Sequence, residues 1–119
     1  MNNKNNAYFF VYETVDIPLL FEPDGALEGY KKIVVSLAQF GTTIIEKWQD
    51  ELGIDVENNR INLSLSQEET AMFTGGKKCD PKIVDIQVNI YYETQERDTT
   101  FNEIIEVYSN QHKKVISNE

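Results

Sequence analysis

Apolar and polar residues alternate strictly along residues 61–65 of this sequence, over the longest stretch along residues 82–93, and less strictly along residues 99–108. Alternation is typical of a β-strand that buries one face, because successive side chains point to opposite sides of the strand. We therefore predict three strands here. The side chains expected in the core are Ile61, Leu63, Leu65, Val84, Ile86, Val88, Ile90, Ile105 and Val107.

Residues 30–40 and 42–48 form a predicted hairpin, since both are rich in β-branched residues and Gly41 between them permits a tight turn. Residues 52–56 are a further short predicted strand, followed by the Asn-rich turn of residues 57–60.

Near the N-terminus, residues 7–14 are rich in aromatic and β-branched side chains and are a predicted strand. Residues 17–21 are a second apolar run. Pro18 places this run at the edge of a sheet or at a strand start, because proline has no N–H to donate to a neighbouring strand.

One short helix is predicted after residue 65. Ser66 and Glu69 have the spacing of a capping box, in which each side chain binds the backbone of the other residue. We expect about two helical turns that run to Phe73 and end at the glycine pair 75–76. Met72 and Phe73 are the expected core contacts of this helix.

Many short strands with one short helix favour a mostly-β fold, namely an antiparallel immunoglobulin-like (Ig-like) β-sandwich. The chain of 119 residues has the size of one domain. We expect an N-terminal disordered tail over residues 1–6, a single domain over residues 7–108, and a C-terminal tail over residues 109–119.

The net charge of −9 disfavours negatively charged partners. Binding to nucleic acid needs clustered Lys and Arg, and an anionic membrane also attracts basic surfaces, so we expect neither partner. The acidity either keeps the protein soluble or meets a basic partner subunit. The single cysteine excludes an intrachain disulfide and indicates a reducing compartment. We see no signal peptide and no membrane-spanning stretch.

No constellation of residues in the sequence supports catalysis. The lone His112 and the lone Cys79 cannot build a zinc site or a catalytic triad. No calcium-loop pattern is present, and the Gly-Gly-Lys-Lys run at residues 75–78 lacks the spacing of a phosphate-binding loop. We therefore expect no enzyme, no cofactor and no metal.

Apolar side chains outside the expected core are the candidates for an interface. Residues 8–12 are more apolar than an exposed strand edge should be, and such edges invite pairing with another chain. The alternative is that they cover the domain's own core. The candidate interface residues are Tyr8, Phe9, Phe10, Tyr12, Trp48, Tyr91, Val115 and Ile116.

Four segments resemble a small family of proteins from phages and prophages of Gram-positive bacteria (Firmicutes). They are residues 34–41 (V-x-x-A-Q-x-G), 61–70 (I-x-L-x-L-[ST]-Q-E-[ED]-T), 86–90 (I-Q-V-x-I) and 113–116 (K-x-V-I). The resemblance implies a non-enzymatic virion protein of the tail, baseplate or head–tail region. It would be assembled in the host bacterial cytoplasm through contacts with other virion subunits or as a homo-oligomer.

A carbohydrate-binding or adhesion module on the same sandwich is the alternative function. The exposed aromatic side chains discriminate between the two. A sugar binder presents a coplanar pair of rings beside polar residues, whereas an assembly protein presents an apolar patch or an unpaired sheet edge.

Overall fold

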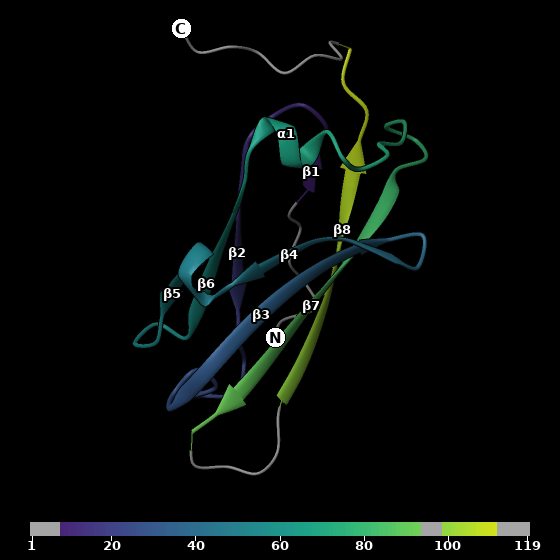
Figure 1. The fold of residues 1–119 in the computed structure, drawn as a ribbon. Helices are drawn as coiled ribbons and strands as arrows, with labels where there is room; N and C mark the ends of the chain where they lie inside the picture. The colour runs from purple at the N-terminus through teal and green to yellow at the C-terminus, as the bar shows by residue number, and fades with distance from the viewer. Residues whose placement is uncertain (1–7, 94–98, 112–119) are drawn as a thin grey trace, which may run out of the picture.

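The computed structural model describes residues 8–93 and 99–111, which form two β-sheets that pack on one core (Figure 1). The five-stranded sheet has the order β1-β8-β7-β3-β4 and the three-stranded sheet the order β2-β6-β5. The predicted sandwich is confirmed. The strands are β1 (Tyr8–Phe10), β2 (Val15–Leu20), β3 (Tyr30–Gln39), β4 (Thr42–Trp48), β5 (Gly53–Asp55), β6 (Arg60–Leu65), β7 (Lys82–Tyr92) and β8 (Thr99–Tyr108).

Two short helices complete the described residues: the 3₁₀ turn η1 (Gln49–Glu51) and the single turn of α1 (Gln67–Thr70). The expected tail of residues 1–6 lies outside the described residues, as does the expected C-terminal tail from residue 112 onward.

The core lies between the two sheets. All nine predicted core residues are buried, and none is more than 2% exposed. Side chains of β2 and β3 complete the same cluster from the two sheets. They are Ile17, Leu19, Ile33, Val35 and Leu37.

The N-terminal segment differs from the prediction. Residues 7–14 were expected to form one strand, but β1 ends at Phe10 and the chain then turns, with Tyr12 at a positive φ of 69°. The turn carries the chain from the five-stranded sheet to β2 in the other sheet. β1 pairs with β8 in parallel, so the sandwich is not wholly antiparallel. Pro18 does lie on an edge strand, because β2 pairs with β6 alone among the described strands.

The predicted β3–β4 hairpin is confirmed. Gln39 pairs with Thr42, so the loop consists of Phe40 and Gly41. Both residues have positive φ, 54° and 79°, which is the geometry of a type I′ turn. Its backbone twist matches the right-handed twist of the flanking strands.

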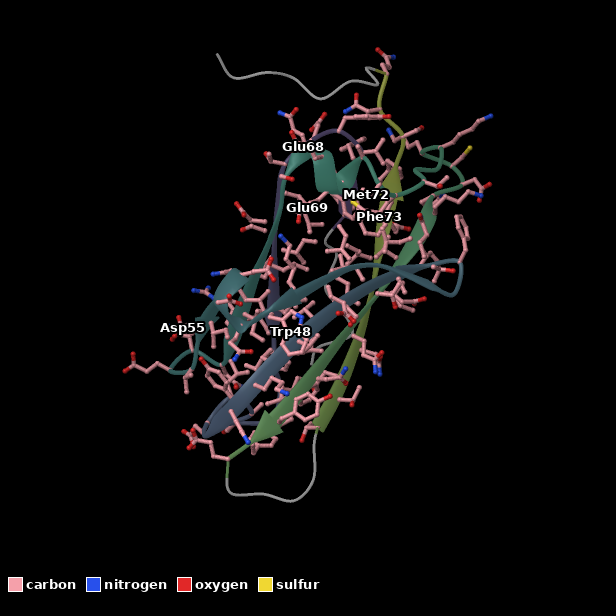
Figure 2. All side chains as sticks on the ribbon, viewed as in Figure 1. Trp48, Asp55, Glu68, Glu69, Met72 and Phe73 are labelled. Atoms are coloured by element: carbon pink, nitrogen blue, oxygen red, sulfur yellow. The ribbon has the colours of Figure 1, made fainter. Side chains whose placement is uncertain are left out.

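The capping box is confirmed, but the helix is shorter than predicted. Ser66 Oγ accepts a hydrogen bond from the Glu69 N–H at 3.2 Å, and Glu69 Oε1 accepts one from the Ser66 N–H at 2.9 Å. α1 nevertheless ends after one turn, at Thr70. Phe73 is buried as predicted, whereas Met72 is 57% exposed and is not a core contact (Figure 2).

The glycine pair 75–76 has another role than the expected helix end. Neither glycine has positive φ. A Cβ on Gly75 would collide with the backbone of Tyr108, and one on Gly76 with the backbone of Asp80. Glycine is needed because this loop runs directly against the end of β8, where the Gly76 N–H donates to Val107 O at 2.9 Å.

Candidate protein-binding face

The two outer faces of the sandwich differ in polarity. On the three-stranded sheet, β2 and β6 present mainly polar side chains such as Asp16, Asn62 and Ser64. One end of the five-stranded sheet presents a group of apolar side chains instead. We call this group the outer patch, and it consists of Tyr8, Phe10, Phe40, Ile83, Ile104 and Tyr108.

Strand register brings the outer patch together from distant parts of the chain. Ile83 on β7 and Tyr8 on β1 both pair with Glu106 on β8, so the three side chains form one row across the sheet. Phe10 pairs with Tyr108 in the next outward row. The β3–β4 turn brings Phe40 to the same region, because Phe40 lines a hollow together with Ile83 of β7 and Ile104 of β8.

Large apolar side chains of the outer patch are open to solvent. Phe40 is 71% exposed, Ile104 57%, Tyr8 53% and Ile83 51%. Isolated exposed apolar residues are common on soluble proteins, but a contiguous group marks an interaction site.

Three aromatic rings border a hollow in the patch. The Tyr8 ring meets the rings of Phe10 and Tyr108 edge to face, with both centroid distances at 5.8 Å. Together with Gly76 and Lys78 these rings line a hollow of about 370 Å³, which we call the ring hollow. The Tyr108 hydroxyl donates to Glu106 Oε1 at 2.8 Å, and this hydrogen bond raises the pKa of Tyr108.

A second hollow, of about 420 Å³, lies beside the β3–β4 turn and is lined by Phe40, Ile83 and Ile104 among others. Among the described residues, Phe40 is the most exposed of the large apolar side chains, and its backbone is left-handed. Bulky residues rarely adopt that conformation, which asparagine and glycine tolerate. The turn therefore holds an aromatic side chain in solvent at a cost in backbone strain.

Charged groups are mixed into the outer patch. Asp85 pairs with Ile104 and Glu106 pairs with Ile83. Each acidic side chain on β7 or β8 therefore lies opposite an apolar one on the neighbouring strand. Lys78 lines the ring hollow and Lys82 lines the second hollow. The charged residues around the six apolar side chains of the patch thus include two acidic and two basic ones.

Two of the candidate residues from the sequence, Tyr8 and Phe10, lie in the outer patch. Phe9, between them, points the other way, because side chains alternate along the strand. It is 2% exposed and packs edge to face on Phe73, with ring centroids 5.5 Å apart. Phe9 is therefore a core residue and not an interface residue. Tyr12 is half-buried and packs against the core.

The candidates Trp48 and Tyr91 lie together elsewhere on the five-stranded sheet. Lys32 Nζ is 5.6 Å from the centre of the Trp48 ring and 5.5 Å from that of Tyr91, within cation–π range of both. Figure 2 shows Trp48 well away from α1. The candidates Val115 and Ile116 lie outside the described residues.

Sequence reasoning missed Phe40, Ile83 and Ile104 as surface candidates. A signal for two of them was present: if Val84 and Ile105 face the core, then Ile83 and Ile104 must face outward. Phe40 could have been noticed as an aromatic residue next to glycine in a tight turn.

Within residues 8–93 and 99–111, no group of three or more His, Cys, Asp or Glu side chains lies close enough to hold a metal ion. In the same residues no helix is long and apolar enough to cross a membrane. Cys79 is exposed and free.

Comparison with known proteins defines the class of fold. No family model and no curated protein matches the chain. Among solved structures, an endo-β-1,4-mannanase from Thermotoga petrophila matches with a TM-score of 0.54 at 11% identity, over 90% of this chain but 18% of the mannanase. The chain thus spans less than a fifth of that enzyme. CD84 matches at 13% identity and TM-score 0.42, over 87% of this chain and 95% of its own. Tim-2 matches at 11% identity and TM-score 0.45, over 98% and 100%.

The chain is an Ig-like β-sandwich. In the nomenclature of that fold, β8-β7-β3-β4 correspond to strands G-F-C-C′, and β2-β6-β5 correspond to B-E-D. Antibody domains join strands B and F by a disulfide and pack a tryptophan of strand C against it. Here the one cysteine is exposed and Trp48 ends β4, so a core of aliphatic and phenylalanine side chains joins the sheets in place of a disulfide and a tryptophan.

Proposed function

We propose that this domain is a non-enzymatic structural or accessory protein that docks onto other proteins through its outer patch. One observation carries the proposal: large apolar side chains gather at one end of the five-stranded sheet, whereas the outer face of the other sheet is mainly polar. The strained, exposed Phe40 supports it, because strain at a solvent-exposed site is a cost that a functional contact would offset.

The setting we propose is a bacteriophage or prophage-derived particle, as a part of the tail, baseplate or head–tail region. This part of the proposal rests on the sequence resemblance. The partners would then be other particle subunits.

The geometry of the rings favours docking over sugar binding. A sugar-binding platform needs flat, coplanar rings, whereas the rings of the patch meet at 82°, 88° and 37°. Trp48 and Tyr91 are also unsuitable, because the ammonium group of Lys32 lies over both rings.

A matched pair of substitutions tests the proposal. Ile104 and Leu20 are both exposed isoleucine-sized side chains, 57% and 51%, but Leu20 lies on the three-stranded sheet outside the patch. The chain is expressed with the proteins encoded beside it, and incorporation into sedimenting particles is measured by mass spectrometry. We expect Ile104→Asp to abolish incorporation and Leu20→Asp to leave it unchanged.

Equal incorporation of both variants would exclude the outer patch as the docking face. Absence of the wild-type chain from every particle would exclude the proposed setting. Circular dichroism of both purified variants is the control that checks whether the substitutions leave the fold intact.

A further inference from the structure

Charge is distributed unevenly between the outer patch and the rest of the molecule. The chain carries a net charge of −9. Among the residues that line the two hollows or lie between them, the acidic Asp85 and Glu106 are equal in number to the basic Lys78 and Lys82. The adjoining loop adds one charge of each sign, from Lys77 and Asp80. The net negative charge of the chain therefore comes from residues outside the patch and its adjoining loop.

This distribution decides which kind of partner fits. A strongly basic partner would be drawn to the acidic surface in general and would have no preference for the neutral patch. A second copy of this chain would be repelled over most of the acidic surface, but not at the patch. The patch thus combines the exposed apolar area with the absence of like-charge repulsion.

The shape of the patch also fits a second copy. Phe40 protrudes from the tip of the β3–β4 turn, and the ring hollow lies on the same face with Ile83 and Ile104 in the region between. In a two-fold symmetric interface, each contact occurs twice with the roles exchanged. A two-fold interface formed by this face would bring Phe40 of each copy against the face of the other that holds the ring hollow.

We propose that the outer patch is a homodimer interface in which Phe40 inserts between Tyr8, Phe10 and Tyr108 of a second copy. The inference rests on the proposed docking function and specifies its partner. An aromatic side chain that enters an apolar pocket near the centre of an interface is the usual form of a binding hot spot.

The test uses the purified chain alone. Molecular mass is measured by sedimentation equilibrium across a wide concentration range, with reducing agent present so that exposed Cys79 cannot crosslink two copies. We expect a concentration-dependent dimer for the wild type and for Leu20→Asp. Phe40→Ala should weaken dimerisation about tenfold or more, and Ile104→Asp should do likewise. A second variant, Phe40→Asn, removes the ring and also relieves the backbone strain. A weaker dimer in this variant therefore cannot be caused by a destabilised turn.

Salt provides an independent readout. Because two copies of charge −9 repel each other, raising the ionic strength should screen the repulsion and strengthen the dimer. A wild-type protein that stays monomeric at the highest concentration overturns the proposal, as does a Phe40→Ala variant that dimerises like the wild type. If the chain is monomeric but Ile104→Asp still abolishes particle incorporation, the docking function stands and its partner is a different protein.

Discussion

Phe40 and Glu103 each occupy a position where the local structure favours another residue type, as does Tyr12, whose φ is 69°. Phe40 is a bulky residue in a left-handed turn. Glu103 places a carboxyl group on the inward face of β8, where its neighbours two residues away are Phe101 and Ile105, and it is 5% exposed. The first departure lies in the outer patch and fits a functional contact there. For the second, nothing in the structure provides a functional reason.

Substitution of Phe40 should separate stability from association. Phe40→Asn places a residue that tolerates positive φ in the turn, so we expect it to stabilise the monomer by about 1 kcal/mol. Phe40→Ala removes the same ring but keeps the strain, so the stability of the monomer should change little. Urea denaturation of both variants at low protein concentration measures this. A Phe40→Asn variant that is no more stable than Phe40→Ala would show that the turn is unstrained.

Glu103 should make stability depend on pH. Burial raises the pKa of its carboxyl group, and neither ion pair found among the described residues includes it. The folded state therefore binds the proton more tightly than the unfolded state does. The contribution of this group to stability falls as the pH rises from the ordinary pKa of a glutamate through the raised value.

We accordingly expect Glu103→Gln to raise the urea midpoint at pH 7 and to have a smaller effect near pH 4, where the wild-type carboxyl group is itself protonated. Denaturation curves of both proteins at several pH values check this. An equal difference between the two proteins at every pH would contradict the assignment.

At the scale of the elements, alternation predicted the strands whose pairing is antiparallel and whose faces differ in polarity. β6, β7 and β8 were found this way, with the buried residues on the correct faces. The end of α1 was not predictable, because a capping box fixes where a helix starts and not how long it runs. The prediction that the glycine pair 75–76 ends the helix was wrong, in part because Gly75 is required by its close approach to Tyr108, a contact between residues distant in sequence.

Hydrogen bonds between a side chain of β3 and the backbone that follows α1 are another contact between residues distant in sequence. Gln39 at the end of β3 is buried, and its amide group forms two hydrogen bonds of 2.7 Å with the backbone N–H and C=O of Thr74. Gln39→Ala would leave both backbone groups without these partners, so we expect a loss of about 2 kcal/mol in stability. Gln39→Glu can make both hydrogen bonds only while its carboxyl group is protonated, so it should cost less near pH 4 than at pH 7, where burial penalises the charged form. Chemical denaturation of both variants measures the difference.

The start of α1 provides a second prediction at this scale. Glu69 binds the Ser66 N–H through one oxygen and Lys47 Nζ of β4 through the other, at 2.6 Å. Ser66→Ala should cost about 1 kcal/mol, as for other N-caps. Ser36→Ala, on β3 and away from any helix end, is the control. An unchanged midpoint for Ser66→Ala would mean that the cap does not contribute to stability.

The Glu69 carboxylate makes the stability of the α1 start depend on pH, with a sign opposite to that of Glu103. Burial alone would raise the pKa of Glu69, but the hydrogen bonds from Lys47 and from the Ser66 backbone outweigh burial and lower it. The stability that Glu69 contributes is therefore present at neutral pH and is lost as the pH falls through its lowered pKa.

At the scale of the whole molecule, the outer patch could not be predicted as a unit. Its six residues come from three strands and a turn, and they meet only through the registers of β1 with β8 and of β8 with β7. Sequence alternation shows which side of a strand a residue faces, but not which other strand lies beside it. The candidates Tyr8 and Phe10 were found because of their composition, whereas Ile83 and Ile104 required the sheet.

The N-terminal strand joins the two functions that sequence reasoning left open, covering the core and presenting an interface. Tyr8 and Phe10 belong to the outer patch, while Phe9 and Val11 are buried in the core. Val11 is also held at the C-terminal end of β8: its N–H donates to Tyr108 O at 3.1 Å, and its C=O accepts from Asn110 Nδ2 at 3.2 Å.

Deletion of residues 1–12 should therefore destabilise the fold as well as prevent association. Loss of the Phe9 side chain alone is expected to cost about 3–5 kcal/mol, and the paired edge of β8 would become exposed. Deletion of residues 1–7, which leaves β1 complete, is the control and should retain both the midpoint and the dimer. The double substitution Tyr8→Ser and Phe10→Ser should keep the midpoint within about 1 kcal/mol, since both side chains face outward, and yet weaken the dimer. Thermal denaturation and sedimentation equilibrium of these three variants give the answer. If deletion of residues 1–12 left the midpoint unchanged, β1 would not be part of the folded sandwich, and its aromatic residues would be free to act as a separate docking arm.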